Sequence, residues 1–294
     1  MKLLRAELFK LRTTSMWWVF ALAWLVTTGV VLAVNSVNAR ALLKPFDQYV
    51  SIQTHGHESP TTLDPGRLDH FKSDWTAGHD VIVQAAKIYT SGQLIGLLLA
   101  CLLAIVLVTV EFQQLTATST FLTTPRRRAV VQAKLGTALI VAGLAWAATT
   151  VLSVVVGAVF LHQQGYLVSL GSWSVDRAIL LNLAAYLLWA LFGIGFGTLI
   201  RSQLGATISA TILYLVGSGA AGALFTLLNT YVIKHNWVLS AQVIVPSTAS
   251  TVMISPTQPF DYAPAAWVGA VVIFAWAAVF GLWGVRTLQG RDIA

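Results

Sequence analysis

The chain is poor in charge and nearly free of cysteine. Only 10% of its 294 residues are charged, whereas a soluble globular domain carries about 25%. Its one cysteine, Cys101, falls inside an apolar run, so an intrachain disulfide is excluded. The sequence has no Gly-Lys-Ser or Gly-Lys-Thr phosphate-binding loop, so this chain should not hydrolyse ATP itself.

Apolar residues are what the chain has in excess. They make up 56% of it, and the mean hydropathy is +0.74. About 20 apolar residues cross the hydrocarbon core of a bilayer as a helix. The runs do not alternate apolar with polar residues, so they predict helices rather than barrel strands. We predict an all-α membrane protein with six spans: Met16 to Val34, Ser91 to Val110, Ala138 to Leu161, Ala178 to Ile200, Leu204 to Leu228 and Ala265 to Val285.

The first span has a basic flank and could mimic a signal peptide. No convincing small-residue cleavage site follows Val34, and five more spans come after it. An uncleaved first span is therefore the expectation. Residues 1–294 then form a single transmembrane domain.

The distribution of charge predicts the orientation. With six spans, both termini share a side, and that side has eleven bases and three acids, a net charge of +8. The other side has seven bases and eight acids, a net of −1, and together these give the chain's +7. Basic residues in short loops stay in the cytoplasm, so we expect both termini there, in the inner or plasma membrane of a bacterium. The basic charge indicates topology and anionic lipids, not nucleic acid.

Three segments lie outside the spans on this prediction, besides the turns that join the remaining spans. Residues 1–14 form an interfacial helix, because Leu4, Leu8 and Leu11 recur at helical spacing among basic residues; the alternative is a solvated tail. The first outer segment, 35–87, has room for a short helix but is too small to fold as a separate domain. The last outer segment, 229–264, has an apolar middle, Trp237 to Val245, that re-enters the outer leaflet or packs on the spans.

The inner segment 111–134 reads EFQQLTATSTFLTTPRRRAVVQAK. Its Thr and Ser residues predict a short helix over Gln113 to Thr123 that ends before Pro125. The next helix should begin near Ala129, with Lys134 snorkelling at its inner end.

This segment resembles the permease subunits of ABC transporters of the type-two export subfamily, which is common in bacteria. That family has Glu at the inner end of the second span, a Thr-rich helix, Pro and Arg, and then Ala-Lys entering the third span. Leu115 stands where the family often has Gly. The matching positions are Glu111, Thr116, Thr120, Phe121, Leu122, Pro125, Arg127, Ala133 and Lys134.

Weaker similarities continue along the whole chain. Gly193, Gly195, Gly197, Arg201, Gln203 and Ala206 are similar to the family's turn between spans four and five. Pro246 resembles its last outer loop. The sequence AELFKLRTT near the start and Arg291-Asp292-Ile293 at the end resemble its basic entry and exit.

The resemblance implies half of a transporter. Two permease chains, identical or paralogous, would pair and dock two ATPase subunits, which would hold ATP and Mg; this chain would need no cofactor. The inner segment would be the coupling helix that enters a cleft on the ATPase. Its implied coupling residues are Glu111, Thr116, Thr120, Pro125, Arg126, Arg127, Arg128 and Lys134.

Simpler roles remain open for these charges. The three arginines can serve only to fix topology and contact phospholipid. Glu111 can pair with one of them, with Lys134 or with the ATPase, or it can be a solvated carboxylate at the membrane edge.

The fifth span has an ordered polar stripe. Thr207, Thr211, Tyr214 and Ser218 are spaced by 4, 3 and 4 residues, and Asn229 falls near the same line. At about 100° per residue these side chains share one helix face. In the family, spans two and five tend to line the passage, so the stripe is a candidate substrate path. The alternative is interhelical hydrogen bonding with close packing at Gly217, Gly219 and Gly222.

No charged residue sits deep in a span, which disfavours a proton relay or a midplane ion site and favours an amphipathic or apolar cargo. The six histidines all fall on or near the outer side, at spacings that fit no metal motif, so we expect no metal site.

Three functions compete at this stage. The first is an ABC permease that exports a drug, peptide or lipid-like compound. The second is an intramembrane enzyme, for which the paired ionisable groups are missing. The third is a non-transporting scaffold or sensor subunit linked to an ATPase, because fold does not determine function.

Overall fold

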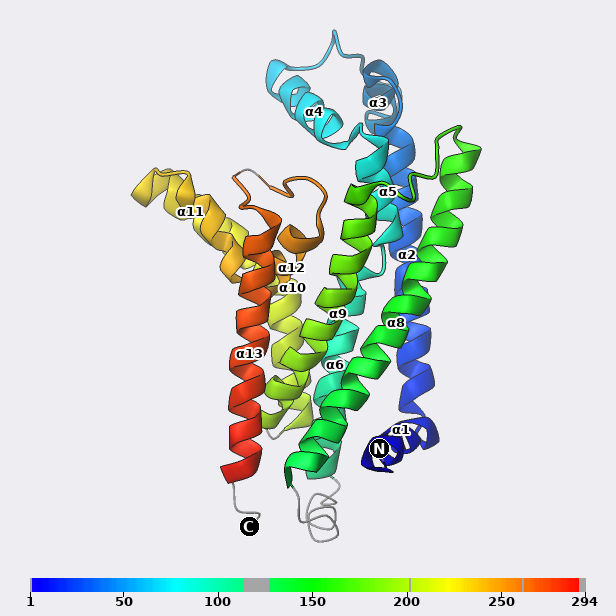
Figure 1. Ribbon diagram of the computed structural model, residues 1–294. Helices are drawn as coiled ribbons and strands as arrows, with labels where there is room; N and C mark the ends of the chain where they lie inside the picture. Colours follow the sequence, from blue (N-terminus) through cyan, green and yellow to red (C-terminus); the bar gives the residue numbers. More distant parts are fainter. Residues whose placement is uncertain (1, 114–126, 201, 261, 291–294) are drawn as a thin grey trace.

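A computed structural model describes residues 2–113, 127–200, 202–260 and 262–290 (Figure 1). Within these ranges the chain is all-helical, and no strand occurs. Six helical stretches are long and apolar enough to cross a membrane, which confirms the predicted number. They are α2 (Met16–Leu42), α5 with α6 (Val81–Val110 together), α8 (Arg127–Gln163), α9 (Trp173–Leu199), α10 (Gln203–Leu228) and α13 (Ala266–Gly290).

Two of the spans extend well beyond their predicted ends. Helix α2 continues from Val34 to Leu42, and α8 begins at Arg127, eleven residues before the predicted span that starts at Ala138 and two before the predicted helix start near Ala129. The 37 residues of α8 would measure about 55 Å at 1.5 Å per residue. That length exceeds the roughly 30 Å of the hydrocarbon core, and tilt accommodates such an excess. Figure 1 shows α8 running obliquely across the bundle.

The second span is two helices joined by a short break. Helix α5 (Val81–Tyr89) precedes α6 (Gln93–Gln113), so the apolar helical stretch begins ten residues before the predicted start at Ser91. At the break, the Ser91 hydroxyl donates to the Ile88 carbonyl at 2.7 Å, and the Tyr186 hydroxyl donates to the Gly92 carbonyl at 2.8 Å. The same two carbonyls also accept backbone N–H groups, that of Ser91 at 3.1 Å and that of Gly96 at 3.0 Å, so the hydroxyls add to the backbone hydrogen bonds at the break.

The centre of the bundle is the contact between α6 and α9. A Cβ added to Gly193 of α9 would overlap the backbone carbonyl of Cys101 on α6. At Gly197, one turn further, an added Cβ would lie 3.0 Å from the Cα of Ile105. The two backbones approach this closely because these positions lack a side chain, as in other membrane helix pairs. These glycines, which resembled a family turn in the sequence, lie within the α6–α9 helix contact.

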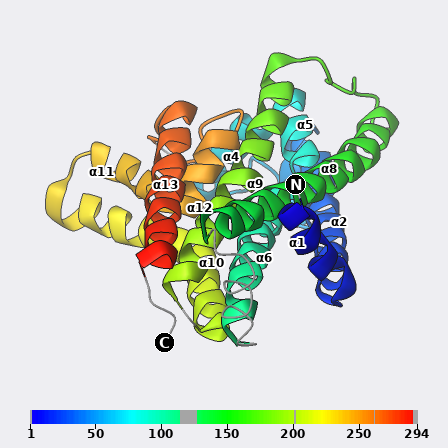
Figure 2. The same cartoon turned by 60° about the horizontal axis from the view of Figure 1, so that its bottom comes forward.

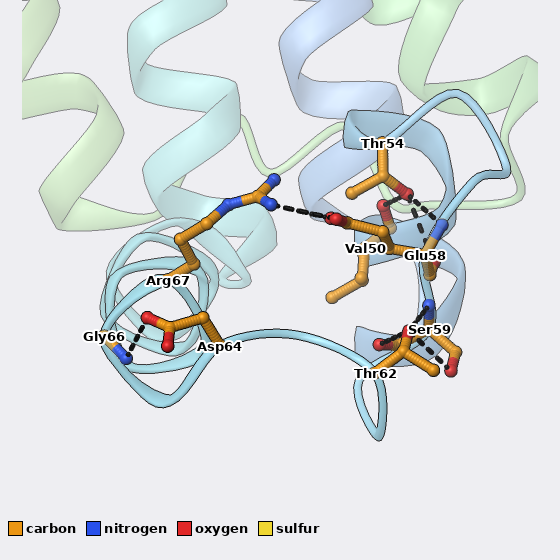
Figure 3. Close-up of polar contacts among 8 residues, drawn as sticks. All are labelled: Val50, Thr54, Glu58, Ser59, Thr62, Asp64, Gly66 and Arg67. Atoms are coloured by element: carbon orange, nitrogen blue, oxygen red, sulfur yellow. Dashed lines mark hydrogen bonds and ion pairs between the residues drawn. The ribbon is translucent and has the colours of Figure 1, made fainter.

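The first outer segment is more ordered than predicted. It contains α3 (Phe46–Gln53) and α4 (Pro65–Gly78), which pack on the end of α2 around Tyr49, Val50 and Leu63. Figure 3 shows the loop between the two helices, where Arg67 donates to Glu58 at 2.9 Å. The Asp64 carboxylate accepts from the Gly66 N–H at 3.2 Å and caps α4.

The last outer segment folds back on the bundle. After α10, a π-helical turn η1 (Asn229–Ile233) leads to α11 (Trp237–Ser240), a 3-10 turn η2 (Ala241–Ile244) and α12 (Pro246–Ile254). The chain bends by 105° between η2 and α12. Helix α12 is almost wholly buried against α9 and α13, and the Trp189 indole donates to Ser250 at 2.8 Å. The predicted apolar middle, Trp237 to Val245, forms α11 and η2, which contact α10 with Val238 and Val243 buried; α12 follows that segment.

The N-terminal helix α1 (Lys2–Thr13) lies across one end of the bundle (Figure 1). The end of α6, the start of α8 and the end of α13 are at this same end. Figure 2, which brings this end forward, shows α1 against α8 and α2, which it contacts. We call it the α1 end below.

Candidate functional site

Most of the predicted coupling segment lies outside the described residues. This holds for Thr116, Thr120, Pro125 and Arg126, and for nearly all of the helix expected over Gln113 to Thr123. Glu111 lies in the last turn of α6, and Arg127 and Arg128 open α8. Helix α8 therefore begins two residues before the predicted start at Ala129. The structure brings both flanks of the segment to the α1 end (Figure 1).

Lys134 is the coupling residue whose surroundings the structure defines best. Its ammonium is buried, with 7% of the side chain exposed, rather than extended outward as the predicted snorkelling requires. It donates to the carboxylate of Glu7 on α1 at 3.3 Å and to the backbone carbonyl of Leu107 on α6 at 3.1 Å. One lysine therefore joins α8 to both α1 and α6.

Glu7 was not singled out in the sequence. It is the one acid among the bases of α1, and its side chain is 9% exposed. Its second oxygen accepts from Lys10 at 2.9 Å, one turn along the same helix. A single acid within an otherwise basic amphipathic helix was the available signal, because a carboxylate in a buried position needs a positive partner.

The leucine stripe of α1 turns toward the bundle. Leu11 is buried, and Leu4 and Leu8 are half-buried, whereas Arg5, Lys10 and Arg12 are exposed. The predicted amphipathic helix is present, and protein covers much of its apolar face. Because Glu7 and Leu11 lie on the same side of α1, the ion pair and the apolar contact fix the helix together.

The polar stripe of α10 also faces its neighbours. Thr207 and Thr211 are half-buried, and each hydroxyl donates to a carbonyl one turn back in the same helix, at 2.9 and 2.8 Å. Tyr214 is buried, and its ring centroid lies 4.9 Å from that of Trp189 in an edge-on arrangement. Ser218 is half-buried. Within this single chain, Tyr214 packs in the protein core.

The face of α10 next to the stripe is apolar and exposed. Leu204, Ile208, Ile212 and Leu215 are all at least 49% exposed. Such a face suits lipid or another protein chain. Of the three glycines named with the stripe, Gly217 lies close to Val245 and Gly222 close to Gln242 of η2, whereas Gly219 has no neighbour within 4 Å of an added Cβ.

The histidines are scattered over the described chain, and no group of three or more His, Cys, Asp or Glu side chains gathers in it. His79 stacks on Trp75 with ring centroids 4.1 Å apart, and its Nδ1 lies 2.8 Å from the Leu42 carbonyl. His70 faces Asp74 at 3.1 Å on the surface of α4. The remaining predicted outer histidines are His55, His57, His162 and His235.

The chain was compared with models of known protein families and with characterised proteins, and no match was found.

Proposed function

We propose that this chain is the membrane-spanning permease subunit of an ABC transporter of the type-two export subfamily. A second permease chain would complete the passage, and two copies of a separate ATPase would dock on the α1 end. The cargo would be amphipathic, such as a drug, a peptide or a lipid-like compound. Both termini would be cytoplasmic, in a bacterial inner membrane.

One observation carries the proposal. The end of the bundle that gathers α1, the flanks of the 114–126 segment and the end of α13 (Figure 1) is also the end to which the sequence assigns eleven bases and three acids. Basic residues stay on the cytoplasmic side of a bacterial membrane, where an ATPase is available. A basic turn between two long helices is well placed to transmit a rigid-body movement to the spans.

The contact of Lys134 with Glu7 and Leu107 supports a mechanical role for this end. A force on the start of α8 would reach α6 through the Leu107 carbonyl and α1 through the Glu7 carboxylate. Elements joined by a buried ion pair and packed side chains move together rather than bend separately. The coupling segment would then move three elements at once.

The first test is a gentle detergent pull-down of the tagged chain from its native membranes, analysed by mass spectrometry. A near-stoichiometric partner with a phosphate-binding loop is expected, and a co-captured permease would distinguish a homodimer from a heterodimer. Capture of the chain alone, under conditions that preserve a known ABC complex, would contradict the proposal and favour a scaffold or sensor role.

The coupling role has its own test, which uses the triple variant R126A/R127A/R128A. We expect it to be expressed and to lose substrate-stimulated transport in proteoliposomes. Arg67→Ala, on α4 at the opposite end of the bundle, is the matched control and should transport normally. Normal transport by the triple variant, with unchanged affinity for the ATPase, would rule out coupling through these arginines.

A further inference from the structure

A cavity of about 410 Å³ lies between α1, α2, α6 and α8, at the α1 end of the bundle. Binding pockets for small molecules typically range from about 300 to 1,000 Å³. Its inner wall includes Trp24 and Leu103, which are buried, and its outer wall includes Trp17 and Leu144, which are 52% and 64% exposed. The cavity is thus enclosed by the bundle on one side and reachable from the membrane-facing surface on the other.

The chemistry of the lining is almost entirely apolar. Thr149 is the one uncharged polar residue, and its hydroxyl already donates to the Ala145 carbonyl at 2.9 Å. The Trp24 indole is likewise used, donating to the Gly96 carbonyl at 3.1 Å. Water needs two or more polar partners to stay in a cavity, and this lining offers few. The lining therefore suits an apolar occupant, which would restore the contacts that the walls of an empty space of this size lack.

A cation marks one side of the cavity. Arg12 lines it from α1 and is exposed, and no ion pair or hydrogen bond to its side chain is found within the described residues. Glu7, the acid of α1, is already shared between Lys10 and Lys134. Trp17, which lines the same cavity, is the second residue of the first span, and tryptophans are typical of the depth where headgroups meet hydrocarbon.

We propose that this cavity binds one acyl chain of an anionic phospholipid, whose phosphate is held by Arg12. A bilayer supplies acyl chains at the exposed outer wall, and the unpaired guanidinium favours an anionic headgroup over a zwitterionic one. The lipid would fill the space under α1 and hold that helix on the bundle. The inference needs the chain to lie in a membrane with α1 near the headgroups; it requires neither transport nor an ATPase.

The experiment uses the full-length chain in liposomes that contain trace phosphatidylglycerol with a photoreactive group in its acyl chain. A parallel sample contains phosphatidylcholine with the same group. After illumination, peptide mapping locates the adducts. We expect phosphatidylglycerol adducts on the cavity walls, at α2 and α8 near Leu25 and Leu144, at least threefold above those of phosphatidylcholine.

Variants separate a built site from ordinary boundary lipid. Arg12→Gln should lower the phosphatidylglycerol adducts at the cavity at least threefold, while Arg5→Gln, on an exposed part of α1 that does not line the cavity, should leave them unchanged. Ala148→Phe should fill the cavity and remove the adducts. If that variant is not monodisperse on gel filtration, Leu144→Trp replaces it.

Three results would overturn the inference. Equal labelling by the two lipids, unaffected by Ala148→Phe, would mean boundary lipid only. Adducts elsewhere on the chain would place the lipid at another site. A transported compound or a helix of another protein that occupies the cavity and prevents labelling would identify a different occupant. The pull-down of an ATPase is independent of all three, so the two proposals fail separately.

Discussion

The ammonium of Lys134 and the carboxylate of Glu7 lie 3.3 Å apart although 127 residues separate them in the chain. Both side chains are at least 90% buried, at 7% and 9% exposure. Taking two charges out of water is costly, and their attraction offsets the cost only with good geometry and further hydrogen bonds. Lys10 and the Leu107 carbonyl supply those bonds.

Removing one partner of this pair should destabilise the protein strongly. Glu7→Ala removes the carboxylate that both Lys134 and Lys10 contact, and removing one partner of a buried pair typically costs about 3–5 kcal/mol. A lower unfolding temperature is expected in detergent, measured by fluorescence-detected gel filtration after heating. Arg5→Ala, exposed on the same helix, is the control and should change little. The double variant Glu7→Leu/Lys134→Met should recover much of the stability, because it replaces both buried charges of the pair with apolar side chains; failure to recover would show that the pair itself is not the cause.

The close contact of α6 with α9 can be tested by adding one methyl group, because alanine should destabilise a glycine position that is packed but not one that is open. Gly193→Ala places its Cβ on the Cys101 carbonyl, so the helices must separate, and overpacking of this kind costs about 1–3 kcal/mol. Gly143→Ala in α8 meets no atom within 4 Å. It should be neutral or stabilising by up to about 1 kcal/mol, since alanine is the better helix former. Equal unfolding temperatures for the two variants would contradict the close approach of α6 and α9.

Helices α2, α6 and α12 show which features of the fold can be predicted from the sequence alone. Hydropathy predicts that six spans exist, because a long apolar run has few other solutions. Hydropathy does not predict that the first helix continues to Leu42 or that the second helical stretch begins at Val81. Both extensions contain polar residues that are hydrogen-bonded in the folded chain: Asn35 donates to the Ser91 hydroxyl, and Gln84 donates to the Gly78 carbonyl. The bend before α12 and the break at Gly92 depend on contacts with α9 that no local pattern encodes.

In the candidate site too, the sequence identifies some residues but not the neighbours they contact. Lys134 was identified from its place in a motif, but its partner Glu7 lies on another helix and becomes visible only in three dimensions. The stripe on α10 was predicted from helical spacing, and spacing cannot tell which neighbour a face meets. The structure places Tyr214 of that stripe against Trp189.

Tyr214 should therefore behave as a packing residue. Tyr214→Phe keeps the ring against Trp189 and should leave the unfolding temperature nearly unchanged. Tyr214→Ala removes the ring and should cost about 3–5 kcal/mol, as for other large aromatic deletions in cores. If both variants keep their stability and both change the range of exported compounds in proteoliposomes, the ring is part of the path instead.

Orientation is the remaining prediction, and the chain is well suited to test it. Cys101 is the one cysteine and is buried, so Cys101→Ala gives a background without thiols. In that background we expect Ser73→Cys, on the exposed surface of α4, to react with a membrane-impermeant maleimide in intact spheroplasts. Ala6→Cys, exposed on α1 at the other end, should react only after permeabilisation. The expectation rests on the net charges of −1 and +8 that the sequence assigns to the two sides. If Ala6→Cys reacted in intact spheroplasts and Ser73→Cys reacted only after permeabilisation, the basic end would be outside. A cytoplasmic ATPase could not reach it, and the proposed function would be contradicted.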